Sequence, residues 1–207
     1  LISDAEFSGF TVTGSGTGST DVGIWVTGGD PVVRNNKVHG NRNGIQLRSG
    51  TNALVCGNRV YDNGTFGQVD EGLSVVSSAP LVSNNYIYRN PIGLYIGQAT
   101  SDGARAINNT VVENGEGIRC ERSSPTVKNN ICANNTQVGV RAFFGNATPQ
   151  LSYNIVWGNP TDYIASSTGI ATPGTGSISA DPEFDVTVPD EFSLLATSPC
   201  IDAGDPS

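Results

Sequence analysis

The sequence predicts an all-β solenoid, and three observations support this fold class. A unit containing two asparagines recurs six times, every 21 to 27 residues, between Asn36 and Asn154. Within the unit, short segments alternate apolar and polar residues, as in residues 45–47 and 140–142, which is the pattern of half-buried strands. The composition includes 26 glycines, and glycine and asparagine favour turns over helices. Repeat periods of roughly 20 to 50 residues indicate stacked repeats.

Three columns of residues define the unit. The first column holds an asparagine two positions before an aliphatic residue in most copies: Asn36, Asn58, Asn85, Asn109, Asn130 and Asn154. Five residues later, every copy has a second asparagine: Asn41, Asn63, Asn90, Asn114, Asn135 and Asn159. The third column holds a glycine followed by an aliphatic residue: Gly23, Gly44, Gly72, Gly93, Gly117 and Gly139. Two asparagine columns at one constant offset do not arise by chance, so the repeat is genuine.

The length of the unit selects the architecture. No copy has the periodicity of a helix, which excludes leucine-rich, ankyrin and other helix-bearing repeats, and a propeller blade needs about 40 residues and four strands. Three strands and three turns per unit describe one coil of a parallel β-helix. Coils stack about 4.8 Å apart, so about seven coils over residues 1–165 form a rod of roughly 30 to 35 Å.

The two asparagine columns are expected to have different roles. An amide has donors and an acceptor, so identical asparagines stacked at strand spacing can hydrogen-bond along the rod. We expect the column from Asn36 to Asn154 to point inward and to form such a ladder. We expect the column from Asn41 to Asn159 to shape the next turn, where asparagine tolerates left-handed backbone geometry.

The repeat ends near residue 165. Residues 166–180 are mostly Ser, Thr, Gly and Ala and are predicted to be a linker or loose loop. The tail, residues 181–207, is predicted to cap the open end of the solenoid, because that end exposes apolar core and strand edges. Its expected anchors are Phe184, Phe192, Leu194 and Ile201.

Charge and composition exclude several classes of partner. The net charge is −8, which argues against nucleic acid and anionic membrane surfaces, because both require clustered basic residues. No apolar run approaches the roughly 20 residues of a membrane span, so no membrane insertion is predicted. The chain begins at Leu1 without an initiator methionine. We therefore expect a fragment of a longer protein, with end-to-end self-association or a neighbouring domain at that end.

The cysteines and the single histidine are expected to be structural. Cys120 and Cys132 replace inward aliphatic residues of the repeat, and unpaired cysteine is among the most buried residue types. Cys56 aligns with Arg34 and is expected at the surface. His39 is expected to be a solvated turn residue. No disulfide, metal site or cofactor is predicted.

The unit Asn-Asn-x-Val…Asn…Gly-Ile-x-Leu resembles the repeats of the right-handed parallel β-helix (pectate-lyase-like) superfamily. The ending Asp-Pro-x-Phe…Ser-Pro-Cys-Ile-Asp-Ala-Gly-Asp resembles that of secreted or surface-attached bacterial β-helix proteins. The resemblance implies right-handed coiling, an irregular C-terminal cap and an extracellular or cell-surface location. It leaves activity open, because the superfamily includes lyases, hydrolases, epimerases, adhesins and spacers.

The strands that follow the glycine column are expected to carry any saccharide site, since the resemblance implies that this face is the usual one. The residue after each aliphatic one points outward, and the next outward position lies two residues further on. Aromatic rings stack on sugars, and Arg, Gln and Glu bind hydroxyls or carboxylates. The predicted ligand-binding residues are Trp25, Gln46, Arg48, Tyr95, Arg119, Glu121 and Arg141. The alternative is that these residues only cover a flat sheet, with surface ion pairs such as Arg119 and Glu121.

An insertion in the third coil supplies the candidate catalytic acids. The segment between the second asparagine and the glycine of the unit, residues 64–71, is longer in this coil than in the others. It places Asp70 and Glu71 at the start of a strand, and Glu116 aligns with Glu71 two coils away. Two coil spacings are about 9 to 10 Å, at the wide edge of the roughly 6.5 to 9.5 Å between the carboxyl groups of inverting glycosidases. The alternative is an acidic loop that solubilises the rod or binds Ca²⁺ loosely.

The sequence therefore predicts an extracellular carbohydrate-interacting module that binds polysaccharide on an exposed parallel sheet. The alternatives are a polysaccharide lyase or inverting glycosidase, and a passive spacer or adhesin stalk without a small-molecule site.

Overall fold

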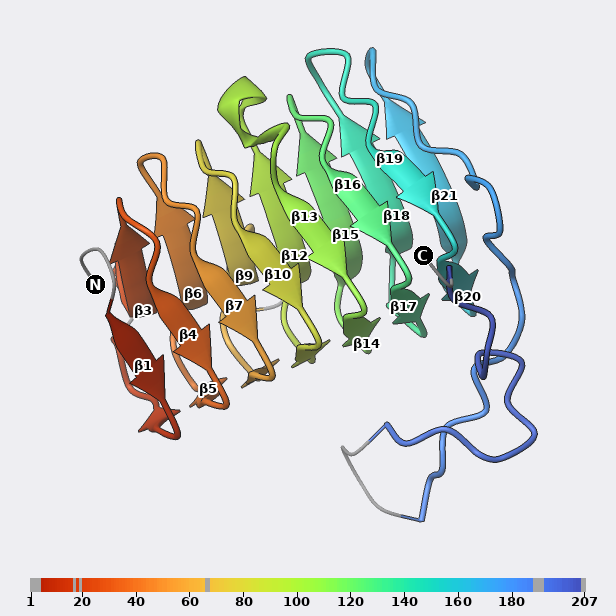
Figure 1. Cartoon of the computed structure of the whole chain (residues 1–207), viewed down its shortest axis with the longest axis horizontal. Coiled ribbons are helices and arrows are strands. Elements are labelled where there is room, and N and C mark those ends of the chain that lie inside the picture. Colours follow the sequence, from red (N-terminus) through yellow and green to blue (C-terminus); the bar gives the residue numbers. More distant parts are fainter. Residues whose placement is uncertain (1–4, 17, 19, 66–67, 188–191, 206–207) are drawn as a thin grey trace.

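In a computed structural model, the chain winds into a rod of stacked coils (Figure 1). The structure describes residues 5–187, except residues 17, 19, 66 and 67, together with residues 192–205. Each coil contributes one strand to each of three sheets, here called sheets A, B and C, and each sheet has seven strands. The coils are numbered 1 to 7 from the N-terminal end, so that coil 1 holds β1, β2 and β3. This architecture confirms the predicted parallel β-helix of seven coils.

The strands of sheets A and B are short. Sheet A contains β1 (Glu6–Ser8), β4 (Val32–Arg34), β7 (Leu54–Cys56), β10 (Leu81–Ser83), β13 (Arg105–Ile107), β16 (Thr126–Lys128) and β19 (Gln150–Ser152). Sheet B contains β2 (Thr11–Val12), β5 (Lys37–His39), β8 (Arg59–Tyr61), β11 (Tyr86–Tyr88), β14 (Thr110–Val112), β17 (Ile131–Ala133) and β20 (Ile155–Trp157).

Sheet C has the longest strands, each of six residues. They are β3 (Val22–Thr27), β6 (Asn43–Arg48), β9 (Glu71–Val76), β12 (Ile92–Gly97), β15 (Glu116–Glu121), β18 (Val138–Phe143) and β21 (Thr161–Ser166). A 3-10 helix, η1 (Ala99–Ser101), is the only helix in the described part of the chain. Over those same residues, no helix has the length and hydrophobicity to cross a lipid bilayer.

Equivalent residues of successive coils pair in register, so each inward position becomes an apolar column along the rod. The inward residues of sheet A are Val33, Val55, Val82, Ala106, Val127 and Leu151, all buried. Sheet B contributes Val38, Val60, Ile87, Val111, Cys132 and Val156. Each fully buried aliphatic side chain of this kind stabilises the fold by roughly 1.5 to 3 kcal/mol relative to an exposed one.

The first asparagine column forms the expected ladder at the corner between sheets A and B. From Asn36 to Asn130, each Nδ2 donates a hydrogen bond of 3.0 Å to Oδ1 of the asparagine in the next coil. The same Oδ1 also accepts the preceding backbone N–H, as for Asn85 N to Asn109 Oδ1 at 3.1 Å. In the described residues, no buried side-chain nitrogen or oxygen lacks a hydrogen-bond partner.

The second asparagine column corrects the expectation that it only shapes a turn. From Asn41 to Asn135, these side chains are buried and form a second ladder between sheets B and C, with Nδ2 to Oδ1 distances of 2.9 to 3.1 Å. The left-handed backbone belongs instead to the residue before each ladder asparagine. At the first ladder these residues are Asn35, Gly57, Asn84, Asn108, Asn129 and Tyr153, and at the second they are Gly40, Asp62, Arg89, Glu113, Asn134 and Gly158.

The glycine column exists because of the second ladder. A Cβ atom on Gly93 would lie 2.8 Å from Nδ2 of Asn114, and one on Gly72 would lie 2.7 Å from Nδ2 of Asn90. Side-chain carbons do not approach so closely. Each glycine of the column therefore leaves room for the buried amide of the next coil.

The C-terminal end of the rod is closed by the segment predicted to be a linker. Ile178 N donates to Asn154 O at 3.0 Å, and Val156 N donates to Ile178 O at 3.2 Å. Ala171 joins the core, while Ser177 Oγ accepts from Asn154 N at 3.2 Å, where a further ladder asparagine would otherwise accept. Residues 170–178 thus form part of an eighth coil.

The tail lies against sheet B instead of the rod end. The Phe192 ring packs 5.0 Å from Tyr88 and 5.6 Å from Phe184, measured between centroids, beside the buried Val112 and Ala133. Lys128 Nζ and Asp205 Oδ2 form an ion pair of 2.6 Å. Leu194 pairs with Phe184, whereas the expected anchor Ile201 is 46% exposed.

His39 is not a solvated turn residue. It ends β5, and its ring stacks on Tyr61 at 4.8 Å, while Tyr61 stacks on Tyr88 at 5.0 Å. Cys120 and Cys132 are buried, and burial raises the pKa of each thiol to about 12.

Candidate functional site

The outer face of sheet C presents one row of side chains parallel to the rod axis. Register pairs the row members in coils 1 to 6, which are Trp25, Gln46, Ser74, Tyr95, Arg119 and Arg141. A second row, two residues further along each strand, holds Arg48 and Glu121. Alternation along the strand turns both rows away from the core. The predicted ligand-binding residues therefore share one face.

Trp25 and Arg48 form the N-terminal part of this face. The Trp25 side chain is 43% exposed, and the Arg48 guanidinium carbon lies 5.5 Å from the indole centroid. A guanidinium at this distance is attracted to the ring and holds its orientation. An ordered, solvent-facing indole is suited to stacking on a sugar ring.

Gln46 and Ser74 point outward but are buried, so they do not extend the exposed row. Gln46 Nε2 donates to Ser74 Oγ at 3.3 Å. Trp25 and Tyr95, which are larger, flank the pair in register. The exposed face is consequently divided into two parts, and Gln46 is a buried polar contact between them.

Glu116 anchors the C-terminal part of the face. Arg119 donates from Nε and Nη2 to the two carboxylate oxygens at 2.8 and 2.7 Å, and Arg141 Nε donates to Oε2 at 3.0 Å. Burial alone would lower the pKa of Arg119, but the hydrogen bond and charge of Glu116 raise it overall. With both oxygens engaged, the geometry suits Glu116 to positioning two guanidinium groups instead of accepting a proton from water.

Tyr95 lies along the sheet instead of projecting from it. A Cβ atom added to Gly97 would overlap the Tyr95 ring, so the glycine provides the space beneath the tyrosine. Burial, with the nearby carboxylates of Glu121 and Glu71, raises the pKa of Tyr95 to about 12. Tyr95 therefore remains a neutral phenol and is suited to hydrogen bonding.

Glu71 is the most perturbed carboxyl group of the face. Burial, reinforced by the charge of Asp70, raises its pKa to about 7, against the opposing effect of Arg48 and Arg119. Its backbone N–H donates to Asn43 Oδ1 at 3.0 Å. A carboxyl group with a pKa near neutrality can donate a proton at physiological pH.

The three predicted catalytic acids do not converge. Glu71 and Glu116 both pair in register with Ile92 from opposite sides, so they are separated by two strands, about 9.6 Å along the rod. Asp70 lies elsewhere: its buried carboxylate accepts from Arg42 Nε at 3.0 Å and from Thr65 N at 3.2 Å. Its partner Arg42 belongs to the corner between sheets B and C.

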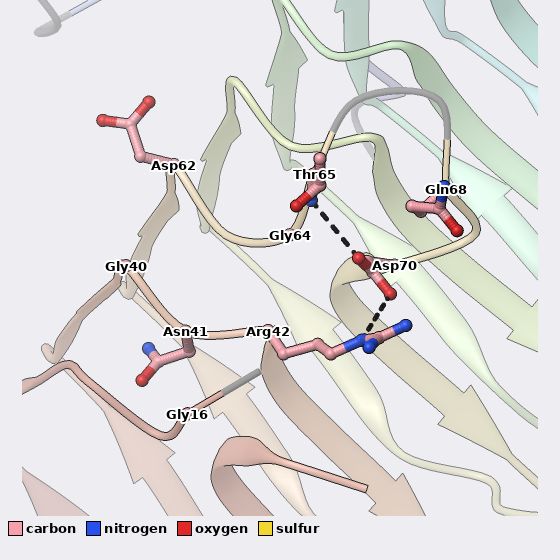
Figure 2. A pocket seen from close by; sticks show the side chains of 9 residues that line it. All are labelled: Gly16, Gly40, Asn41, Arg42, Asp62, Gly64, Thr65, Gln68 and Asp70. Carbon is pink, nitrogen blue, oxygen red and sulfur yellow. Dashed lines mark hydrogen bonds and ion pairs between the residues drawn. The ribbon is translucent and has the colours of Figure 1, made fainter. Parts of the chain in front are cut away.

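Two hollows flank the described part of the coil 3 insertion at this corner. The first hollow, of about 360 Å³, spans coils 1 to 3 and contains the Arg42–Asp70 ion pair (Figure 2). The second hollow, of about 200 Å³, opens onto sheet C and is lined by Gln68, Val69, Pro91, Ile92, Glu116, Arg119 and Gln137. Gln68 lines both hollows. The insertion thus stands between them.

The sequence did not identify Arg42 or Gln137. The signal for Arg42 lies in the column that follows the second ladder, where the residues are Arg42, Gly64, Pro91, Gly115, Thr136 and Pro160. A single charged residue among glycine, proline and threonine marks a departure from the repeat. Within the described residues, no group of three or more His, Cys, Asp or Glu side chains could hold a metal ion.

Comparison with known proteins agrees with this architecture. A family model described as the right handed beta helix region matches residues 22–181. No curated protein and no solved structure matches the chain. The match covers most of the chain and extends from β3 through the partial eighth coil to the start of the tail. The chain therefore belongs to the right-handed β-helix family.

Proposed function

We propose that this chain is a carbohydrate-interacting module that binds polysaccharide along the outer face of sheet C. The observation that supports it most is the spacing of ordered groups in one row. Trp25 in coil 1 and Arg119 in coil 5 are separated by four coils, about 19 Å. Binding groups spread over this length suit an extended polymer better than a compact metabolite.

The groups in the row are ordered before any ligand arrives. Arg48 holds the Trp25 indole, and Glu116 holds Arg119 and Arg141. Side chains that are already immobilised lose less conformational entropy when they bind. The second hollow places Gln137 beside Arg119, which adds an amide donor and acceptor for sugar hydroxyls.

The proposal is tested by titrating the protein with acidic and neutral polysaccharides in a calorimeter. Replacement of Arg119 by Ala should weaken binding roughly 10- to 100-fold, the equivalent of about 1.5 to 3 kcal/mol for a hydrogen bond to a charged group. Arg105→Ala is the matched control, because Arg105 is an exposed arginine on sheet A. Binding that survives the combined replacement of Trp25, Tyr95 and Arg119 by Ala would exclude this face. No binding to any polysaccharide would favour a passive spacer or adhesin stalk.

The second candidate function is a polysaccharide lyase or an inverting glycosidase. The pKa of Glu71, raised to about 7, favours it, because an acid of this pKa can protonate a leaving group near neutrality. Incubation with the same polysaccharides, followed by assay of new reducing ends and unsaturated products, tests it. Product formed by the wild type and lost in Glu71→Gln would establish an enzyme. The absence of any product from the wild type would exclude the lyase and glycosidase functions.

We also place the binding activity outside the cell or on its surface. The support is the resemblance of residues 198–205 to the ending of secreted and surface-attached bacterial β-helix proteins. Fractionation of the producing cells with an antibody to the chain tests this location, and recovery in the cytoplasmic fraction would contradict it.

A further inference from the structure

The first hollow is the larger of the two hollows, and the binding face on sheet C does not use it. Its volume of about 360 Å³ falls within the roughly 300 to 1,000 Å³ typical of small-molecule sites, whereas the second hollow is smaller. It lies beside coils 1 to 3, and Figure 2 shows the side chains around it. The residues that line it are Gly16, Gly40, Asn41, Arg42, Asp62, Gly64, Thr65, Gln68 and Asp70.

Glycines with left-handed backbone line the hollow. Gly40 has a φ of 63°, in the left-handed position that Arg89 and Glu113 occupy in coils 4 and 5. Gly64, with a φ of 74°, is packed against Asp70 and Pro91 and brings the two ends of the insertion together. A Cβ atom on Gly40 would lie 2.9 Å from Thr13 Oγ1, and one on Gly64 would lie 2.6 Å from Asp70 Cβ, so close packing fixes the backbone at the edge of the hollow.

One wall of the hollow is a fixed ion pair. Asp70 is buried, and its two oxygens accept from Arg42 Nε and from the backbone N–H of Thr65. The Arg42 side chain is 29% exposed, so a buried carboxylate holds a guanidinium that still reaches solvent. Figure 2 shows the guanidinium beside the Asp70 carboxylate, joined to it by a dashed line. Such support reduces the entropy lost when the group binds a ligand.

The charges around the hollow cancel. Arg42 pairs with Asp70, and Asp62 on the opposite rim pairs with Arg89 through contacts of 2.9 and 3.1 Å. The remaining described side chains of the lining are two amides and a hydroxyl, and none is aromatic or aliphatic. The Asn41 amide is engaged in the second ladder, so a ligand would meet the Gln68 amide and the Thr65 hydroxyl. A lining without net charge that exposes more polar than apolar surface does not suit ions or hydrophobic molecules. It matches an uncharged, polyhydroxylated ligand.

We propose that the first hollow is a separate subsite for an uncharged sugar unit, about three coils or 14 Å along the rod from Arg119. This inference rests on the proposed carbohydrate-binding function and extends it to a second position. Gln68 lies between the two positions and lines both hollows. A neutral glycan chain long enough to pass Gln68 contacts both, and a short neutral oligosaccharide occupies the first hollow alone.

The test uses the full chain and linear neutral hexose oligosaccharides of two to six units. Thr65→Trp fills the first hollow from an exposed position, and Arg42→Lys keeps the positive charge beside Asp70 while removing the planar donor fork. Each variant should weaken binding of the dimer at least tenfold by calorimetry. Arg34→Lys is the matched control, because Arg34 forms an exposed ion pair with Glu6 on sheet A, and it should leave binding unchanged.

The outcomes separate this inference from the proposed function. If the oligosaccharides bind the wild type, Thr65→Trp and Arg42→Lys equally, the subsite is overturned while carbohydrate binding stands. If Arg119→Ala abolishes dimer binding and Thr65→Trp does not affect it, the neutral sugar occupies the second hollow instead, which also overturns the subsite. If the wild type binds no saccharide, the proposed function fails and the subsite with it. Thermal unfolding of each variant shows that the fold is retained.

Discussion

Asn85 illustrates why a side-chain amide occupies each ladder position. Its Nδ2 donates to Val55 O at 2.9 Å, to Ser83 O at 3.0 Å and to Asn109 Oδ1 at 3.0 Å. Its Oδ1 accepts from both the backbone N–H and the Nδ2 of Asn58 at 3.0 Å. An aspartate could accept the last two hydrogen bonds but could not donate the first three. The ladder position therefore requires donor and acceptor atoms on one short side chain.

Replacement of Asn85 by Ala should lower the free energy of unfolding by about 3 to 5 kcal/mol. Each buried group left without a partner costs about 1 to 3 kcal/mol, and the change leaves several such groups on Asn58, Val55 and Ser83. Denaturant unfolding followed by circular dichroism measures the effect. Asn52→Ala is the control, because Asn52 is exposed outside the ladders, and it should change stability by less than about 0.5 kcal/mol. Equal effects of the two changes would contradict this role of the ladder.

Glu71 should make stability depend on pH in the neutral range. Its pKa is raised from 4.5 to about 7 in the folded state, so the folded state binds this proton more tightly than the unfolded state. The contribution is fully present below about pH 4.5 and is lost as the pH rises through about 7. After allowance for solvent screening of a half-buried group, the loss is on the order of 2 kcal/mol.

The Glu71→Gln variant removes this proton and should flatten the pH profile. The variant should be more stable than the wild type near pH 8, and the difference should shrink toward pH 5. Urea unfolding at several pH values measures both curves. A wild-type profile that rises from pH 5 to 8, and is unchanged by the substitution, would show that Glu71 is not protonated in the folded state.

At the scale of the coil, the glycine column and the second ladder are one structural unit. Each glycine faces an amide of the next coil, so the strands of sheet C start at the same point in every coil. This common start aligns Trp25, Tyr95 and Arg119 on one face. The outward row of sheet C thus depends on residues that are not part of that row.

Gly93→Ala should destabilise the rod by about 1 to 3 kcal/mol, the typical cost of an overpacked core. The new Cβ would lie 2.8 Å from both Asn114 Nδ2 and Val111 Cγ1, which cannot both move without breaking ladder contacts. Gly204→Ala is the control, because its nearest neighbour would be Asn129 at an ordinary distance of 3.6 Å. Thermal unfolding of both variants measures the difference, and an unchanged melting temperature for Gly93→Ala would mean that the second ladder yields easily.

The tail stabilises coils 4 to 6 from the outside. The outward row of sheet B changes from large residues, Tyr61 and Tyr88, to small ones, Val112 and Ala133. The small residues leave a notch that the rings of Phe184 and Phe192 fill. A C-terminal element can therefore pack along a solenoid instead of closing its end.

For the whole molecule, the sequence predicts the fold well because each column of the repeat has one structural role that only one type of residue fulfils. Asparagine, glycine and aliphatic residues recur at fixed offsets, and only a stack of parallel coils satisfies all of them. The sequence does not distinguish the second ladder from a turn, because asparagine suits both environments. The residues that do adopt left-handed geometry there include Arg89 and Glu113, which carry no sequence signal for it.

The candidate site is less predictable because it depends on side-chain directions. The sequence indicates which residues face outward, but it does not indicate that Gln46 is buried and hydrogen-bonded to Ser74. The pairing of Arg42 with Asp70 joins residues 28 positions apart and is set by the path of the insertion. The sequence also gives no sign that the Tyr95 ring lies over Gly97.

The two ends of the ladders make the number of coils adjustable. Ladder asparagines give way to Phe10 and Ser15 in coil 1, and Ser177 and Asp162 supply the last acceptors at the other end. Every coil between them presents the same ladder donors and acceptors to the coils on either side. Insertion of a second copy of residues 109–129 directly after Asn129 should lengthen the rod by about 4.8 Å and preserve both ladders. Small-angle X-ray scattering would measure the added length. The length of the rod would then be set by the number of repeats that the gene encodes.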